Sequence, residues 1–251
     1  MSVHTSHTRC LTVGPFQSNC YVLGPTDRGR GVLVDPGDEA DRILGVLGGS
    51  EAQLAAILLT HAHLDHVGAV AAVRRATGAP IYLHPADLPL YERAAEQGAQ
   101  FGLAIEPPPA PDHELREDMP LVFDDLKLDV LHTPGHSPGG VTLVGDGETF
   151  VGDCVFAGSI GRTDLPGGDY DTLIDAIATK ILSLPGETTL LPGHGPPTSV
   201  AIEASTNPFL APLMEPCFQC GAPLPLRRFG HKGGHCPNCG HPCPPGDCSD
   251  A

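Results

Sequence analysis

Residues 60–66 contain four side chains that commonly bind metal ions in proteins. The segment reads Thr-His-Ala-His-Leu-Asp-His and follows a short, wholly apolar run that predicts a buried strand. In an extended stretch, residues i and i+2 point in the same direction, so His61 and His63 can share one metal ion. The chain then turns into a predicted helix, which would direct Asp65 and His66 toward a second centre.

Three further candidate ligands follow predicted strands elsewhere in the chain. His136, Asp153 and His194 each come after apolar β structure and lie among Gly or Pro residues, in loops of the kind that present reactive groups on a rigid scaffold. A mixed set of imidazoles and carboxylates without Cys suits zinc, iron or manganese. The other histidines are interpreted as solvated loop residues: His4, His7, His84, His113 and His132.

A competing motif for nucleophilic catalysis lies around one of these histidines. Residues 135–139 satisfy the G-x-S-x-G pattern of serine hydrolases, in which the residue after Ser donates its backbone N–H to the oxyanion hole. Pro138 has no N–H to donate, and it would obstruct the helix that follows such a turn. We therefore set the serine-hydrolase interpretation aside.

Alternating strand and helix patterns must position these residues. The helical patterns are Ala40–Leu47 with Asp38 as its cap, Gly68–Thr77, a stretch over 85–102, and an amphipathic run from Leu173 to Leu184. The predicted strands are Arg9–Val13, Cys20–Leu23, Gly31–Val34, Leu54–Leu59, Pro80–Leu83, Leu126–Leu131, Val141–Val144, Thr149–Val151 and Thr188–Leu191. This mixture favours an α/β sandwich over an all-β barrel.

A change of composition marks a second module near the C-terminus. Residues 1–210 form the expected catalytic domain, 211–216 a linker, and 217–251 a small module. Cys217, Cys220, Cys236 and Cys239 give the spacing C-x2-C-x15-C-x2-C, which predicts one structural zinc in a zinc ribbon. A disulfide-linked or disordered tail is the alternative, and two more cysteines fall outside the spacing and stay unassigned: Cys243 and Cys248.

Net charge and hydropathy indicate which classes of partner the chain is unsuited to bind. The chain has 251 residues and a net charge of -16, with 11 Lys and Arg against 28 Asp and Glu before Pro216 and three against two after it. Such acidity disfavours a nucleic-acid partner. We expect a cytoplasmic protein, because no apolar stretch is long enough to span a bilayer and no leader is recognisable.

Three cysteines outside the C-terminal module are expected to be small buried residues: Cys10, Cys20 and Cys154.

The ligand pattern resembles that of the metallo-β-lactamase superfamily, whose H-x-H-x-D-H signature is matched at residues 61–66. The resemblance covers about residues 9–210. Segments 14–21, 156–164 and 191–196 are most similar to compact glyoxalase II-like hydrolases (hydroxyacylglutathione hydrolases). The resemblance implies an αββα sandwich with the site at the rim shared by two sheets.

The resemblance also implies the ligand assignment. One metal ion would be held by His61, His63 and His136, the other by Asp65, His66 and His194, and Asp153 would bridge them. Two divalent ions that share a water lower its pKa, supply a bridging hydroxide and polarise the carbonyl that it attacks. A thioester suits such a site because a thiolate departs readily. As a minor role, Asp65 could also accept the hydroxide proton.

The resemblance determines the residues that would contact the substrate less closely than it determines the metal ligands. Full-length glyoxalase II has an additional helical domain that contacts glutathione, and nothing after Pro216 replaces it. Arg162 and Tyr170, in the loop after Asp153, are candidates for contacting a substrate carboxylate or acyl group, with a purely structural loop role as the alternative. Residues 161–164 also resemble the mononuclear-iron persulfide dioxygenases. A third interpretation is a binding protein that docks a protein partner or a second subunit through its ribbon.

Overall fold

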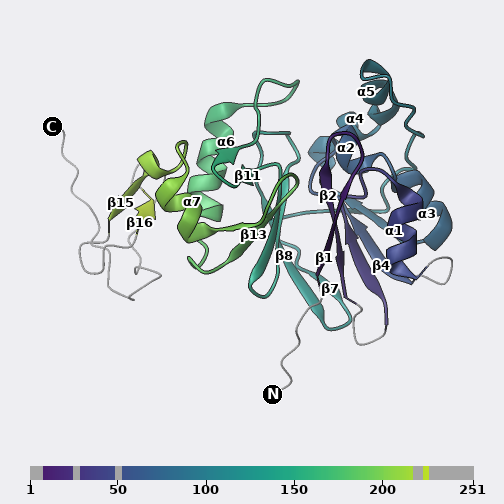
Figure 1. The fold of residues 1–251 in the computed structure, drawn as a ribbon, viewed down its shortest axis with the longest axis horizontal. Coiled ribbons are helices and arrows are strands. Elements are labelled where there is room, and N and C mark those ends of the chain that lie inside the picture. The colour runs from purple at the N-terminus through teal and green to yellow at the C-terminus, as the bar shows by residue number, and fades with distance from the viewer. Residues whose placement is uncertain (1–7, 25–28, 49–52, 217–222, 226–251) are drawn as a thin grey trace.

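Two β-sheets pack face to face and carry helices on their outer faces (Figure 1). The computed structural model describes residues 8–24, 29–48, 53–216 and 223–225. In Figure 1, α1 and α3 lie on the outer side of one sheet, and α6 and α7 lie on the outer side of the other. This order of layers confirms the predicted αββα sandwich. Within the described residues, no helix is long and apolar enough to cross a lipid bilayer.

The first sheet has six strands in sequence order. Strands β1 to β3 are antiparallel, and β3 to β6 are parallel to one another. The bounds are β1 Arg9–Val13, β2 Ser18–Leu23, β3 Gly31–Val34, β4 Leu54–Leu58, β5 Ile81–Leu83 and β6 His113–Glu114. Its outer helices are α1 (Ala40–Leu47) and α3 (Val70–Thr77), whose apolar faces pack on β3, β4 and β5.

The second sheet also has six strands, in the order β14-β13-β10-β9-β8-β7. The bounds are β7 Leu121–Phe123, β8 Leu126–His132, β9 Val141–Val144, β10 Glu148–Gly152, β13 Thr189–Pro192 and β14 Thr198–Ser199. Its outer helices are α6 (Tyr170–Ala176), which continues as the π-helical turn η3 (Ile177–Ile181), and α7 (Val200–Thr206). Apolar residues of all three pack in one cluster with β10 and β13.

Shorter elements surround the ends of these strands. They are α2 Leu64–Val67, η2 Pro85–Asp87, α4 Leu88–Tyr91, α5 Ala94–Gln100, β11 Val155–Phe156, β12 Ser159–Ile160, η4 Ala211–Leu213, β15 Met214–Pro216 and β16 Pro223–Pro225. The segment expected as a linker therefore has regular structure, and Leu213 is buried against the helices of the second sheet. The three-part division of the chain stays a prediction.

The direction of the strands brings the candidate ligands to one edge. A third apolar cluster, which includes Val34, Leu58, Val130 and Phe150, fills the space between the sheets. Strand β4 runs parallel to β3, and in the other sheet β8, β10 and β13 all run in one direction. The loops after β4, β8, β10 and β13 consequently leave the sandwich at its carboxyl-terminal rim, as the resemblance implied.

One prediction about the histidines was wrong, because His113 and His132 belong to strands β6 and β8 rather than to loops.

Two further local predictions were also wrong. The N-cap of α1 is Glu39 rather than Asp38; Glu39 has the left-handed conformation, and no side chain caps the helix. Asp38 instead accepts a hydrogen bond from the Glu39 backbone N–H at 2.6 Å. Cys10 is exposed, because alternation along the edge strand β1 turns Leu11 and Val13 toward the core. Cys20 and Cys154 are buried, as expected.

Candidate metal centre

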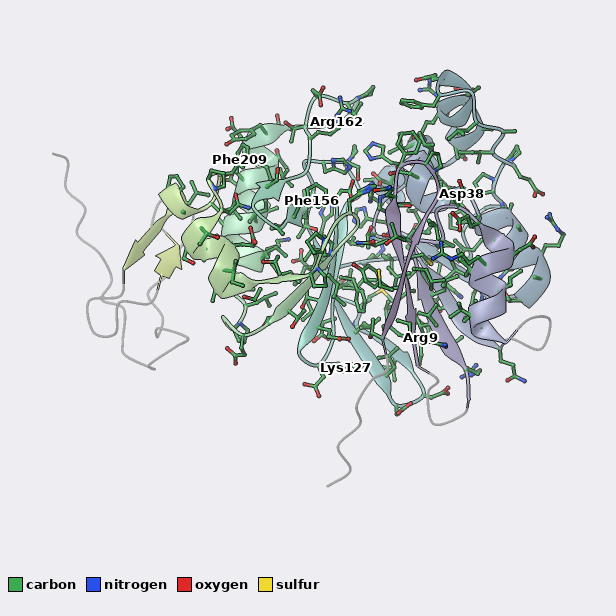
Figure 2. All side chains as sticks on the ribbon, viewed as in Figure 1. Arg9, Asp38, Lys127, Phe156, Arg162 and Phe209 are labelled. Carbon is green, nitrogen blue, oxygen red and sulfur yellow. The ribbon has the colours of Figure 1, made fainter. Side chains whose placement is uncertain are left out.

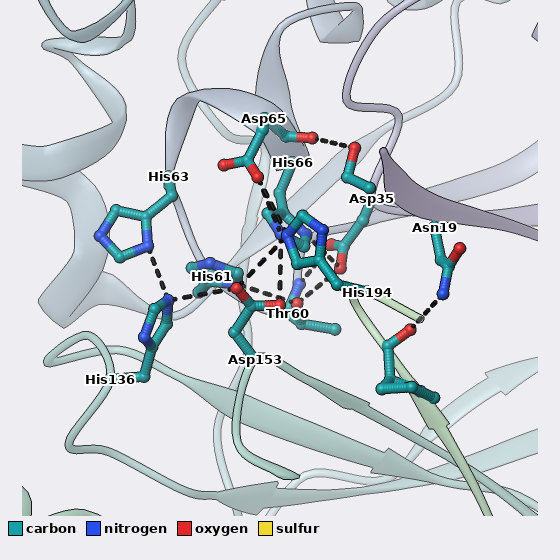
Figure 3. Close-up of polar contacts among 12 residues, drawn as sticks. Asn19, Asp35, Thr60, His61, His63, Asp65, His66, His136, Asp153 and His194 are labelled. Carbon is teal, nitrogen blue, oxygen red and sulfur yellow. Dashed lines mark hydrogen bonds and ion pairs between the residues drawn. The ribbon is translucent and has the colours of Figure 1, made fainter. Parts of the chain in front are cut away.

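Three histidines from two loops form the first group of potential ligands (Figure 3). Ligand atoms of His61, His63 and His136 all lie within 4.8 Å of one another. His63 Nδ1 is 2.8 Å from His136 Nε2, and all three side chains are buried. The first two residues follow β4 and the third follows β8, so the group joins the two sheets.

A second group lies beside the first and contains a carboxylate. Ligand atoms of Asp65, His66 and His194 also lie within 4.8 Å of one another. Asp65 Oδ2 is 3.0 Å from His194 Nε2 and 3.8 Å from His66 Nε2. Asp65 and His66 belong to the short helix α2, whereas His194 follows β13.

Asp153 lies between the two groups (Figure 3). Its carboxylate oxygens are 3.4 Å from His66 Nε2 and 3.5 Å from the Nε2 atoms of both His136 and His194. One carboxylate therefore touches histidines of both groups. All seven residues that the resemblance singled out converge at one place.

Buried polar atoms without hydrogen bonds indicate that this arrangement fits metal ions. His61 Nε2, His66 Nε2 and Asp153 Oδ1 are buried and have no hydrogen-bond partner, which is costly unless another group binds them. Burial, reinforced by His136, lowers the pKa of His63 to about 3. Burial, reinforced by the neighbouring histidines, also places the pKa of His61 well below its usual range. Both imidazoles are consequently neutral, the form that binds a metal.

The second group has the electrostatics of a cation site. Burial opposes protonation of His66, but Asp153 and Asp65 outweigh it and raise the pKa to about 10. Burial likewise opposes ionisation of Asp65, yet His66 and His194 lower the pKa of this carboxyl below its usual range. The carboxylates thus create a field that favours positive charge at this point.

Asp35 supports the centre, although the sequence analysis did not single it out. The side chain is buried and accepts hydrogen bonds from the Thr60 backbone N–H at 2.7 Å and from Thr60 Oγ1 at 2.6 Å. Asp35 Oδ2 also lies 3.0 Å from His66 Nδ1. This contact turns His66 Nε2 toward Asp153, a common support for metal-binding histidines. Since its oxygens have these partners, Asp35 acts as a support more than as a ligand.

Asp87 is a second buried support that sequence analysis missed. It accepts hydrogen bonds from the Ala62 N–H at 2.9 Å, Ser137 Oγ at 2.8 Å and the Gly139 N–H at 2.6 Å. One carboxylate thereby ties the loop of His61 and His63 to the loop of His136. Ser137 is fully buried, and this contact gives the serine of the G-x-S-x-G pattern a structural role.

Strand β2 holds the loop that carries His194. Asn19 Nδ2 donates to the Pro192 carbonyl at 3.0 Å and to the Gly195 carbonyl at 2.8 Å, and the Tyr21 hydroxyl donates to Pro192 at 2.6 Å. A side chain at Gly193 would collide with Asp153 Oδ1 and with the His66 ring. Only glycine therefore permits this close approach of the loop to the centre.

The two candidate substrate-binding residues have different surroundings. Arg162 lines a cavity that opens on the centre, and its guanidinium pairs with Asp164 at 2.7 Å. Its carbonyl also accepts a hydrogen bond from His136 Nδ1 at 2.7 Å. Tyr170 begins α6, is 48% exposed, and is not among the described residues that line this cavity. Figure 2 shows Arg162 near the upper edge of the molecule and Lys127 near its lower edge.

The expected zinc-ribbon ligands lie outside the described residues. This applies to all four cysteines of the C-x2-C-x15-C-x2-C pattern: Cys217, Cys220, Cys236 and Cys239. The structural zinc and the ribbon therefore stay predictions.

The αββα sandwich and its His and Asp cluster define a metal-dependent hydrolase. The family profile described as Metallo-beta-lactamase superfamily matches residues 13–194, so the chain belongs to this superfamily. It is 41% identical to the probable metallo-hydrolase YqgX of Bacillus subtilis and 37% identical to the hydroxyacylglutathione hydrolase GloC of Haemophilus influenzae. Each match covers 80% of this chain and 96% of the relative. The crystal structure of TTHA1623 in a di-iron-bound form is 48% identical, with a TM-score of 0.74 over 80% of this chain and 100% of that chain.

Proposed function

We propose that the protein is a binuclear hydrolase of thioesters such as S-lactoylglutathione or a related hydroxyacyl thioester. The observation that carries the proposal is the position of Asp153 between two three-residue groups, which suits a pair of metal ions. The identity to a hydroxyacylglutathione hydrolase supports the substrate class.

Each group has a defined part in this proposal. One ion would be held by His61, His63 and His136, the other by Asp65, His66 and His194, and Asp153 would contact both. Such a pair lowers the pKa of water and polarises a scissile carbonyl. Asp35 and the Arg162 carbonyl orient the imidazoles of His66 and His136.

Other residues would act on the substrate. Asp65 lies at the floor of the cavity, where its carboxylate can accept a proton during attack. The Arg162 side chain lines the same cavity and would contact a substrate carboxylate by exchanging it for its present partner Asp164. Tyr170 would contact an acyl or thiol group long enough to extend beyond the cavity.

Metal analysis combined with an assay tests the proposal. We expect about two zinc-class ions for the centre, with iron or manganese as alternatives; the di-iron form of TTHA1623 shows that a similar protein binds a metal pair. A third ion, zinc, would occupy the ribbon at residues 217–251. Hydrolysis of S-lactoylglutathione by the holoenzyme would support the proposal.

A single iron with oxygen uptake on glutathione persulfide would contradict the proposal and favour a persulfide dioxygenase. Failure to turn over any substrate, together with a partner bound at the ribbon, would favour the binding-protein interpretation.

A further inference from the structure

A cavity of about 520 Å³ opens directly on the metal centre. Its floor includes His63, Asp65, His136, Asp153 and His194, so both ligand groups face it. The walls come from the β1–β2 turn, from α4 and α5, and from the segment that follows Asp153. A substrate whose carbonyl reaches the centre must therefore place the rest of its atoms against these walls.

Apolar side chains dominate the walls. They include three phenylalanines and three aliphatic residues: Phe16, Phe101, Phe156, Leu90, Ile160 and Leu165. Phe16 and Phe101 meet edge to face with ring centroids 5.3 Å apart, although they are 37% and 59% exposed. An exposed pair of aromatic rings beside a reactive centre is typical of a binding surface for an apolar ligand.

Several polar groups of the described walls already have partners within the protein. Arg93 pairs with Glu96 at 2.8 Å, and Arg162 pairs with Asp164. The Gln97 amide accepts from the Leu64 N–H at 3.2 Å and donates to the Leu90 carbonyl at 2.8 Å. A lactoyl group offers one methyl to these apolar walls, and glutathione is a charged peptide, so S-lactoylglutathione leaves much of the apolar surface without a partner.

We propose that the preferred thioester carries an apolar group of four or more carbons, which packs against Phe16, Phe101 and Phe156. This inference rests on the proposed thioester hydrolysis and specifies its substrate class. Each methylene removed from water at such a surface contributes about threefold to fourfold in binding. The preference should consequently grow with chain length until the cavity is filled.

Two substrate series with the metal-loaded enzyme test the inference. The first joins glutathione to acetyl, butyryl and hexanoyl groups, with S-lactoylglutathione as reference. The second joins an acetyl group to ethane-, butane- and hexanethiol, whose leaving-group chemistry is closely matched. A rise in kcat/KM of about tenfold or more from the shortest to the longest member of either series supports the proposal and identifies the apolar side of the thioester. Equal or falling values in both series would overturn it while leaving thioester hydrolysis intact. Failure of the loaded enzyme to cleave any thioester would instead overturn the proposed function.

A pair of variants assigns the preference to the cavity wall. Phe101→Ser should lower kcat/KM for the longest member of the preferred series about tenfold and reduce its advantage over the acetyl member. Val122→Ser is the matched control, because Val122 is 65% exposed on the edge strand β7 and does not line the cavity. An unchanged chain-length dependence in Phe101→Ser and in the corresponding Phe16→Ser and Phe156→Ser variants would contradict the assignment.

Discussion

Asp153 lies within 3.5 Å of histidines from both ligand groups, so a single side chain connects the two halves of the centre. In the Asp153→Ala variant we expect loss of bound metal and a fall in kcat by more than about a hundredfold. This exceeds the 10- to 100-fold effects seen when residues that merely support metal ligands are removed. Metal content by mass spectrometry and kcat on a thioester measure both effects.

An exposed carboxylate provides the control for this substitution. Asp129 on β8 is exposed and pairs only with Lys127 at 3.1 Å among the contacts described for it, so Asp129→Ala should keep metal and turnover. Circular dichroism should show the same helix and strand content in both variants as in the unmodified protein. Full activity of Asp153→Ala would contradict the bridging role.

The ligand-bearing loops depend on Asp87, which joins two of them through contacts with Ala62 and Ser137, 25 and 50 residues away in sequence. Asp87→Ala leaves three buried donors without their acceptor, each costing about 1–3 kcal/mol of the free energy of unfolding. We expect weaker metal binding at His61, His63 and His136 in particular, because their loops would no longer be tied together. Ser137→Ala removes one donor and should cost about 1 kcal/mol.

Glu203 offers a matched comparison for the Asp87 substitution. Its buried carboxylate also accepts three hydrogen bonds, from Gly158, Thr198 and Asn207, but it joins α7 to the β11–β12 hairpin. Glu203→Ala should lower the melting temperature without reducing metal content. Measuring the metal affinity of both variants by titration distinguishes a role in metal binding from a role in stability alone. Equal metal affinity in Asp87→Ala and the unmodified protein would show that Asp87 contributes only to general stability.

Buried supporting residues such as Asp87 are harder to predict from the sequence than the metal ligands. His61, His63, Asp65 and His66 are recognisable because their spacing is local, and the fold class follows from the alternation of short apolar runs such as β4 with helical patterns. Asp35 and Asp87 contribute through contacts with residues 25 or more positions away, and neither lies in a local pattern that marks it as part of a metal site. Very short strands, including β6, β11 and β12, have only two residues each and exist through pairing that periodicity does not encode.

At the scale of the whole molecule, metal ions should contribute to stability as well as catalysis. They would bind His61 Nε2, His66 Nε2 and Asp153 Oδ1, which are buried and otherwise make no hydrogen bonds. At a metal concentration about 100 times the Kd, binding adds about 2.7 kcal/mol. Chelation should consequently lower the melting temperature of the protein by about 5–10 °C. Calorimetry with and without chelator measures the shift, and an unchanged transition would contradict a metal-stabilised centre.

The C-terminal region should be dispensable for hydrolysis. All seven candidate ligands and both sheets lie before residue 200, and relatives that are matched over 96% of their length cover only 80% of this chain. We expect a chain truncated after Leu213 to keep kcat/KM within about twofold on small thioesters and to lose one zinc. Truncation after Leu210 is the matched control, because it also removes Leu213 from the apolar cluster of the second sheet and should lower the melting temperature further. If the chain truncated after Leu213 still bound two ions but had lost turnover, the C-terminal region would take part in catalysis.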